Sequence, residues 1–178
     1  MSRGWRRILR PFYRLLEKRI IQVADRISVT TEALREDLLQ RYGLAPDKVE
    51  VVYNVVPPMA DDQPIEDPRQ EPKRIIYGGA MSRVQKPEIL LKAYAQLLTR
   101  DSKWSGRLQV DLYGPESPYF LSNIRKLLSK DCSFCGFVPQ AEMARLVAGV
   151  DIGFFSLSED TYAYATPTKL FDYIEAGV

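Results

Sequence analysis

The residues best suited to chemistry lie near the end of the chain, in the segment Ala165-Thr-Pro-Thr-Lys-Leu-Phe-Asp. An apolar strand and a polar loop precede it, and Thr168 opens a helix that carries Lys169 and Asp172 in its first turns. Backbone amides, a cation and a carboxylate therefore converge beyond the carboxyl end of a strand. This combination predicts a site for a ligand that bears phosphate and hydroxyl groups.

Three further loops leave the ends of predicted strands. The loop of residues 78–86 combines glycines, which allow close backbone approach, with the cations Arg83 and Lys86, which suit a diphosphate. Its alternative is an ordinary turn with exposed basic residues. Residues 114–117 begin with Gly-Pro, a pair that is common in turns. The backbone around Val138 suits either contact with a flat base or an ordinary helix start. The order and spacing of the loops together indicate one site.

The elements that must position these loops alternate regularly. Strands are predicted at 26–30, 49–53, 74–77, 108–113, 133–138 and 151–156, and helices at 32–42, 87–99, 119–129 and 140–148. Thr31 is a suitable N-cap for the helix that ends at Gly43. This alternation predicts an α/β fold, a Rossmann-like parallel sheet with helices on both faces and the ligand site at the strand carboxyl ends.

A run of prolines and aspartates at 57–72 predicts a linker between a segment of residues 1–56 and one of residues 73–178. The last helix breaks at Gly177, where a doubly wound domain needs another strand. We therefore expect a domain that is truncated at both ends.

The basic character of the chain is local. The net charge is +2, but residues 1–26 hold eight Lys and Arg against Glu17 and Asp25. In residues 3–20 apolar and basic side chains fall on opposite helix faces, with Pro11 starting or kinking the helix. This helix either contacts anionic lipid or packs on a neighbouring domain. Because the rest of the chain is slightly acidic, a nucleic-acid partner is not expected.

No apolar run is long enough for a membrane span or for the core of a secretory signal. We expect a cytoplasmic protein, either free or peripheral on the cytoplasmic membrane face. Cys132 and Cys135 form a lone C-x-x-C in a chain without histidine, so a zinc site is not expected. The odd spacing predicts buried or half-buried thiols on opposite faces of a strand in a reducing compartment.

The motifs together resemble the nucleotide-sugar-binding half of GT-B glycosyltransferases, in particular the retaining group called group 1 or family 4. The matching segments are Ala24-Asp-Arg-Ile-Ser-Val-Thr-Thr-Glu-Ala-Leu-Arg-Glu-Asp-Leu, Pro46-Asp-Lys-Val, Asn54-Val-Val, residues 79–86, Leu112-Tyr-Gly-Pro-Glu, Gly136-Phe-Val-Pro, Val150-Asp-Ile-Gly and Pro167-Thr-Lys-Leu-Phe-Asp-Tyr-Ile-Glu-Ala-Gly. The resemblance covers nearly the whole chain after residue 17. It implies that residues 1–56 are the end of an acceptor domain and residues 73–178 an incomplete donor domain.

The resemblance also implies roles for individual residues. Lys86 would neutralise the leaving diphosphate, and Asp172 stands where the family places the second glutamate of its Glu-x7-Glu motif, which holds the ribose hydroxyls. These two are the predicted catalytic residues. The predicted donor-binding set adds the backbone of Gly79, the base contact of Val138 and the helix start, and reads Gly79, Arg83, Lys86, Val138, Thr168, Lys169 and Asp172.

Three positions depart from the family pattern, and one of them is Asp172 itself, which is shorter than glutamate by one methylene. The arginine beside the loop glycine is Ala80 here, so Arg83 would have to replace it. The first motif glutamate is Tyr164, which leaves Glu159 or Asp160 as displaced candidates. These departures suggest a subgroup of the family.

The function implied by the resemblance is transfer of a sugar from a UDP- or GDP-linked donor to a glycan or lipid-linked acceptor, with retention, in polysaccharide biosynthesis. The donor is a substrate, and neither a cofactor nor a metal is expected. Because most of the acceptor domain is missing, the fragment alone is expected to be inactive. The alternatives are a GT-B nucleotide-sugar epimerase, which needs an acid and a base, and a non-catalytic nucleotide-sugar-binding or partner-binding module.

Overall fold

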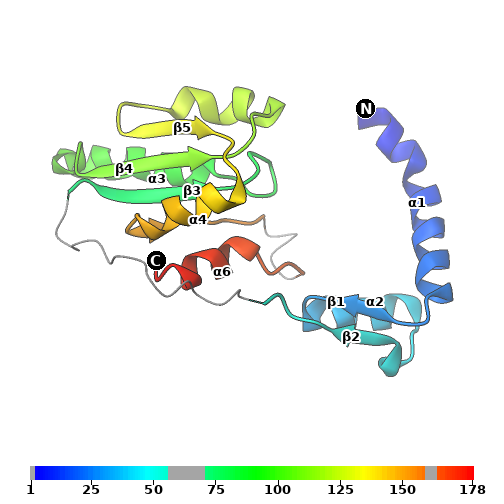
Figure 1. Cartoon of the computed structure of the whole chain (residues 1–178). Helices are drawn as coiled ribbons and strands as arrows, with labels where there is room; N and C mark the ends of the chain where they lie inside the picture. Colours follow the sequence, from blue (N-terminus) through cyan, green and yellow to red (C-terminus); the bar gives the residue numbers. More distant parts are fainter. Residues whose placement is uncertain (1–2, 56–70, 159–163) are drawn as a thin grey trace. The chain divides into compact units, whose positions relative to one another are not determined.

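The computed structural model describes residues 3–55, 71–158 and 164–178, and in the first helix the side chains of Leu9 and of residues from 11 onward. The chain forms two compact units, residues 1–54 with 163–166 and residues 55–162 with 167–178. Figure 1 shows their elements. Most of the predicted linker, residues 57–70, lies outside the described residues.

The N-terminal unit contains two helices and a small parallel sheet. Its elements are α1 (Arg3–Val23), β1 (Ile27–Val29), α2 (Glu32–Tyr42), the short helix η1 (Pro46–Lys48) and β2 (Val49–Val51). Strands β1 and β2 pair in parallel, with Ile27 opposite Val49. The predicted strands are confirmed in place, although both are shorter than predicted.

Helix α2 begins and ends where its sequence predicts. The Thr31 hydroxyl accepts a hydrogen bond from the Leu34 amide at 3.2 Å, which satisfies one of the free N–H groups at the helix start. Gly43 adopts a left-handed conformation with φ 62°, and its amide donates to the Leu39 carbonyl. The helix buries Leu38 against Val29 and Val49.

The C-terminal unit is a four-stranded parallel sheet with helices on both faces (Figure 1). The strands are β3 (Lys73–Gly78), β4 (Leu108–Tyr113), β5 (Cys132–Gly136) and β6 (Ile152–Gly153), and their order in the sheet is β5-β4-β3-β6. Helix α3 (Glu88–Arg100) is followed by η2 (Ser102–Trp104), and later come α4 (Gln140–Ala148) and α6 (Thr168–Glu175). The predicted Rossmann-like architecture is confirmed.

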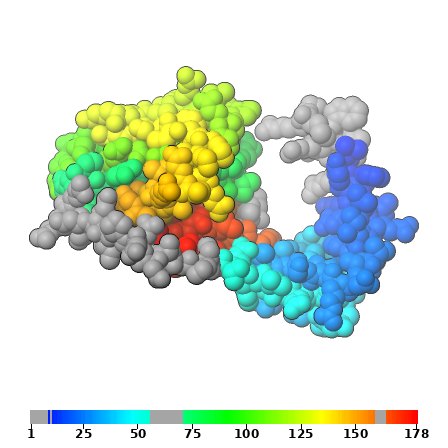
Figure 2. Space-filling view, viewed as in Figure 1, coloured from blue at the N-terminus to red at the C-terminus, as the bar shows by residue number. Residues whose placement is uncertain are grey.

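Each face of this sheet has its own apolar core. On one face, α3 packs Leu91 and Tyr94 against Tyr77 and Leu112 of the strands. On the other, Val147 of α4 and Tyr173 of α6 pack against Ile76 and Tyr113. Helices α4 and α6 contact each other, and in Figure 2 their orange and red atoms form a continuous surface. The helix that carries the predicted site residues is thus anchored to the sheet.

The helix predicted at 119–129 is wrong. The structure has a π-helical turn, η3 (Phe120–Ile124), followed by a short 3-10 turn, η4 (Arg125–Leu127). The Ser122 hydroxyl donates to the Pro118 carbonyl and the Asn123 amide donates to the Tyr119 carbonyl. These side chains occupy carbonyls that a regular α-helix would pair with its own backbone, and this competition favours the irregular turn.

The strand predicted at 151–156 is longer than the observed β6. Only Ile152 and Gly153 pair with β3, opposite Ile75 and Ile76. Backbone bonds from Asp151 to the Arg74 carbonyl and from Phe154 to the Ile76 carbonyl extend this pairing at both ends. The chain then leaves the sheet as the loop that approaches the candidate site.

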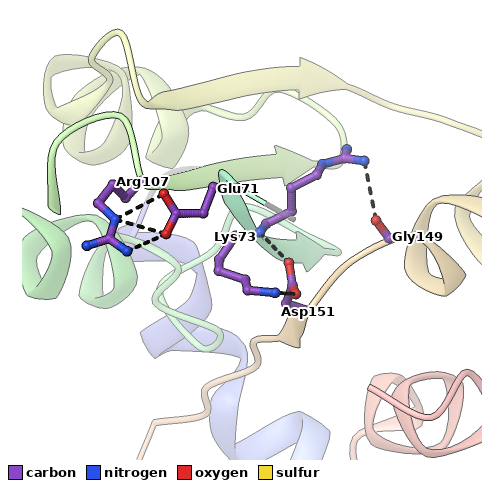
Figure 3. A network of polar contacts seen from close by, with 6 residues as sticks. Glu71, Lys73, Arg107, Gly149 and Asp151 are labelled. Atoms are coloured by element: carbon purple, nitrogen blue, oxygen red, sulfur yellow. Dashed lines mark hydrogen bonds and ion pairs between the residues drawn. The ribbon is translucent and has the colours of Figure 1, made fainter. Parts of the chain in front are cut away.

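Charged side chains fasten the amino ends of the strands (Figure 3). Lys73 donates to Asp151 at 2.7 Å, and the Arg74 backbone amide donates to the same carboxylate at 2.8 Å. Burial raises the pKa of Asp151, but these two hydrogen bonds outweigh it and hold the pKa below its usual range. A second ion pair joins Arg107 to Glu71. These ion pairs therefore link the amino ends of neighbouring strands and stabilise the sheet.

The two cysteines lie on opposite faces of β5, as the spacing predicts. Cys132 is buried in the core beneath α3. Cys135 contacts Tyr113 on the other face and is exposed, so the expectation of two buried or half-buried thiols is wrong for Cys135. The register shift between Leu112 and Tyr113 displaces the end of β5 from its partner strand.

Candidate functional site

The loop at the carboxyl end of β3 begins with a glycine that the site requires. The Gly79 amide donates to the Tyr113 carbonyl at 2.8 Å and the residue has φ 152°, a conformation that side chains rarely adopt. A Cβ at this position would lie 2.3 Å from Cε and 2.5 Å from Nζ of Lys169. The absence of a side chain at Gly79 therefore makes room for the lysine of α6.

The rest of the loop is held by hydrogen bonds from neighbouring segments. The Tyr77 hydroxyl donates to the Ala80 carbonyl at 2.8 Å, and the Ser117 hydroxyl donates to the Met81 carbonyl at 2.6 Å. From the loop after β6, the Ser158 amide donates to the Val84 carbonyl at 2.7 Å. Hydrogen bonds from β3, from the loop after β4 and from the loop after β6 therefore hold the backbone of the loop that the sequence predicts to bind phosphate.

Lys169 is the predicted site residue with the most specific surroundings. Its ammonium lies 3.2 Å from Oε1 of Gln85 and 5.5 Å from the centre of the Tyr77 ring. Burial lowers the pKa of Lys169, and the nearby Asp172 carboxylate opposes this shift. The structure thus brings Lys169 next to Gly79, and Asp172 of the same helix lies close enough for its charge to act on the ammonium.

The two cations of the loop have different surroundings. Lys86 is half-buried with φ 40°, its amide donates to the Ser82 carbonyl at 2.9 Å, and its carbonyl accepts from the Ser156 hydroxyl at 3.3 Å. Arg83 is exposed, and its charge acts on Tyr119. Hydrogen bonds therefore hold the backbone of Lys86. Arg83 is exposed and lies near Tyr119 instead.

The remaining predicted site residues lie at the edges of this arrangement. Thr168 is exposed as the first residue of α6, whose start has no side-chain cap. Its first amides therefore lack a side-chain acceptor. The Val138 side chain packs against the core beneath α4, which leaves its backbone as the part suited to a ligand. The roles of all seven residues stay predictions.

The positions that depart from the family pattern are only partly described. The Ala80 carbonyl accepts from Tyr77, so this residue serves the loop through its backbone. Tyr164 is 41% exposed, and the displaced candidates Glu159 and Asp160 lie outside the described residues. Within the described residues, no group of three or more Cys, Asp or Glu is arranged to hold a metal ion.

The sequence interpretation included Gln85 in the predicted loop but gave no role to the side chains of Gln85, Tyr77 or Ser156. Gln85 is next to Lys86 in the same loop, and its carbonyl accepts from the Ser156 hydroxyl. Tyr77 ends a buried strand, and a buried tyrosine hydroxyl needs a hydrogen-bond partner. That need is the signal from which its contact with the loop could have been expected.

Comparisons with known proteins find similarity to glycosyltransferases. Residues 1–59 match the family described as Glycosyltransferase Family 4. A curated relative, the D-inositol 3-phosphate glycosyltransferase of Streptosporangium roseum, is 29% identical over 151 residues, which are 76% of this chain and 35% of the relative. The chain thus spans about a third of the length of that relative.

Solved structures share the fold at low sequence identity. A point mutant of S. aureus TarM in complex with fondaparinux, α-GlcNAc-glycerol and UDP gives a TM-score of 0.63 at 16% identity, over 90% of this chain and 30% of that one. The α,α-trehalose 6-phosphate synthase of Burkholderia multivorans gives 0.64 at 12% identity, over 99% and 47%. The sequence matches and the shared fold confirm the resemblance drawn from the motifs, which is a resemblance to the GT-B glycosyltransferases of group 1.

Proposed function

We propose that the protein transfers a hexose or N-acetylhexosamine from a nucleoside diphosphate sugar to a glycan or lipid-linked acceptor, with retention of configuration. The observation that carries this proposal is the meeting of the Lys169 ammonium with Gly79 in the loop that also bears Lys86. A cation held beside a glycine loop at the carboxyl ends of parallel strands suits the diphosphate of such a donor.

The chemistry follows from where charge develops. When the bond between sugar and phosphate breaks, negative charge grows on the leaving diphosphate, and fixed cations stabilise that transition state more than the ground state. Lys86 and Lys169 would supply the cations. Asp172 would hold hydroxyl groups of the ribose, and the Val138 backbone would contact the base. UDP in the S. aureus structure supports a nucleoside diphosphate as leaving group.

The first test is binding of UDP, GDP, ADP and their common sugars, measured by thermal shift. A ligand at about 100 times its dissociation constant adds about 2.7 kcal/mol to the stability. We expect a shift for one base that is lost in Lys86→Ala and Asp172→Ala. Lys130→Ala is the matched control, because Lys130 is exposed and precedes the amino end of β5, at the opposite edge of the sheet. No shift from a cooperatively melting chain would refute a donor site.

The second test separates the three classes of function. Transfer with retention gives a glycoside whose anomeric configuration, read by NMR, matches that of the donor. An epimerase converts the nucleotide sugar when acceptor is absent. Binding without either reaction in the full-length parent identifies a non-catalytic module, whereas this chain alone is expected to be inactive and does not decide between the classes.

We also propose a peripheral contact of α1 with the cytoplasmic face of a membrane. The helix contacts α2 through Glu17 and Tyr42, and Ile21 packs against the core of the N-terminal unit. Other apolar side chains of the helix are exposed: Phe12 60%, Leu15 61%, Leu16 44%, Ile20 57% and Val23 75%. No helix within the described residues is long and apolar enough to cross a bilayer. An apolar face with flanking cations suits an anionic lipid surface.

A further inference from the structure

The side-chain oxygen of Gln85 receives two donors in the candidate site. The Tyr77 hydroxyl lies 2.6 Å from Oε1, and the Lys169 ammonium lies 3.2 Å from the same atom. Gln85 is half-buried, and the family resemblance assigns it no role. An amide oxygen with two lone pairs can accept both bonds at once.

The Tyr77 hydroxyl is one of two neighbours that hold this oxygen, and the Lys169 ammonium is the other. The Tyr77 side chain is fully buried at the end of β3, and its hydroxyl also lies 2.8 Å from the Ala80 carbonyl. A hydroxyl has one proton, so it donates to one of the two carbonyl oxygens at a time. In either case the Lys169 ammonium, which can only donate, keeps the oxygen of Gln85 rather than its amide nitrogen toward it.

The backbone of Gln85 is held as well as its side chain. Its amide donates to the Ser82 hydroxyl at 3.3 Å, and its carbonyl accepts from the Ser156 hydroxyl. Both the backbone and the side chain of Gln85 therefore have contacts other than Lys169. A fixed acceptor reduces the number of rotamers that the long lysine side chain samples.

The neutrality of Gln85 matters as much as its position. Among the described residues, the hydrogen-bond partner of the Lys169 ammonium is an amide oxygen and not a carboxylate. A neutral partner orients the ammonium while leaving its charge available to an anion. A carboxylate in the same place would compete with the phosphates for that charge.

We propose that Gln85 is a positioning residue, which holds the Lys169 ammonium beside Gly79 for the diphosphate of a bound nucleotide. Tyr77 supports it by fixing the amide. The proposal rests on the donor site of the proposed function and adds to it the residue that places its cation. Lys169 would contact the ligand, and Gln85 would act through Lys169.

The first arm of the test needs no ligand. NMR titration of the Lys169 side chain, assigned by loss of its signal in Lys169→Arg, reports the groups around it, namely Tyr77 of β3 and Asp172 of α6. Gln85→Glu places an opposite charge near the ammonium and is expected to raise the pKa of Lys169 by roughly one unit or more. Gln85→Met, similar in size but without the acceptor, is expected to broaden the rotamers of Lys169 without unfolding the chain.

The second arm is the dissociation constant for UDP and GDP by calorimetry. Gln85→Met is expected to weaken binding roughly 3- to 10-fold, the range that one hydrogen bond contributes. Gln85→Glu is expected to weaken it further, and Tyr77→Phe to resemble Gln85→Met. Unchanged constants in both Gln85 variants, with binding lost in Lys169→Met, would overturn the proposal.

The two arms fail separately. If the wild-type chain binds no nucleoside diphosphate, the proposed function fails, while the titration still decides whether Gln85 places Lys169. A Lys169 titration and rotamer distribution that are the same in wild type, Gln85→Met and Gln85→Glu would overturn the positioning role whatever the chain binds.

Discussion

The α-carbon of Gly114 faces the carbonyl oxygen of Gly79 so closely that a Cβ at residue 114 would lie 1.9 Å from that oxygen. Both glycines have φ near 150°, and each amide bonds to the next strand end, Gly79 to the Tyr113 carbonyl and Gly114 to the Gly136 carbonyl, each at 2.8 Å. The ladder of the sheet thus continues beyond the strands into the loops. The loops after β3 and β4 therefore approach each other more closely than a residue with a Cβ at position 114 would allow.

Gly114→Ala is therefore expected to destabilise the chain by about 2 kcal/mol or more, because backbone must move to admit the methyl group. Urea unfolding measures the change. Gly106→Ala is the control, since Gly106 has φ 75° but nothing within 4 Å of its added Cβ. Equal losses in the two variants would show that conformation, and not the contact with Gly79, determines the cost.

Gly79→Ala is expected to weaken binding and also to cost some stability, because alanine rarely adopts φ 152°. The added Cβ meets the flexible end of Lys169, which can move aside, so the stability loss should be smaller than in Gly114→Ala. The displaced lysine would no longer stand beside the loop, and affinity for a nucleoside diphosphate should fall about tenfold or more. Calorimetry on the folded variant measures this, and wild-type affinity would contradict the assignment.

Tyr119→Phe is expected to lower the free energy of unfolding by about 1–3 kcal/mol. The Tyr119 hydroxyl donates to Glu88 at 2.6 Å, Glu88 is only 7% exposed, and its second carboxylate oxygen has no partner among the described residues. Removing the hydroxyl leaves a buried carboxylate without this donor. The double variant Tyr119→Phe/Glu88→Met should recover much of the loss, and no recovery would place the cost elsewhere.

The buried tyrosines predict a loss of stability at alkaline pH. Burial is the largest cause that raises the pKa of Tyr94, Tyr113 and Tyr173 from 10.0 to about 12. Their contribution is complete below pH 10, the value of the unfolded chain, and is lost as pH rises through the folded value near 12. Lys169 affects stability in the opposite sense. Its pKa is lower in the folded chain, so its contribution to stability increases as pH rises.

Urea unfolding between pH 8 and about pH 11.5 tests this balance. We expect stability to fall above pH 10, and we expect a shallower fall in Tyr173→Phe. That variant also loses a hydrogen bond of 3.0 Å to the Phe154 carbonyl, so the slope with pH is the informative quantity. Stability that stays constant up to the highest pH would contradict the raised pKa values.

Co-sedimentation with vesicles tests the surface of α1. Phosphatidylglycerol vesicles should bind the chain, neutral phosphatidylcholine vesicles should bind it less, and added salt should weaken the binding. Phe12→Ser/Leu16→Ser should abolish it without loss of stability, since both side chains are exposed. Absence of binding to either vesicle would favour the other interpretation, a helix that packs on a neighbouring domain.

Local signals predicted the regular parts of the fold. Thr31 and Gly43 determine the two ends of α2 through contacts within the helix, so the sequence suffices there. The 119–129 segment looks helical by its apolar spacing, but Ser122 and Asn123 bond to the backbone and change the turn. Side-chain competition of this kind depends on rotamers that periodicity does not report.

The candidate site could be predicted by residue type and not by contact. Gly79, Lys86 and Lys169 were identified because glycine and lysine suit phosphate at strand ends. Gln85 was not, because its role comes from a contact with Lys169 across 84 positions of sequence. Only the fold shows that a neutral amide stands beside the cation.

That separation also determines when the site can exist during synthesis. At about 5–20 residues per second, roughly 4–17 seconds pass between the addition of Gln85 and the addition of Lys169. Strands β3, β4 and β5 precede α6 in the chain, so their part of the sheet can form on the ribosome with the glutamine in place and the lysine absent. A nascent chain in this interval would present the loop with Lys86 but without Lys169, and the proposed site would be complete only when α6 docks.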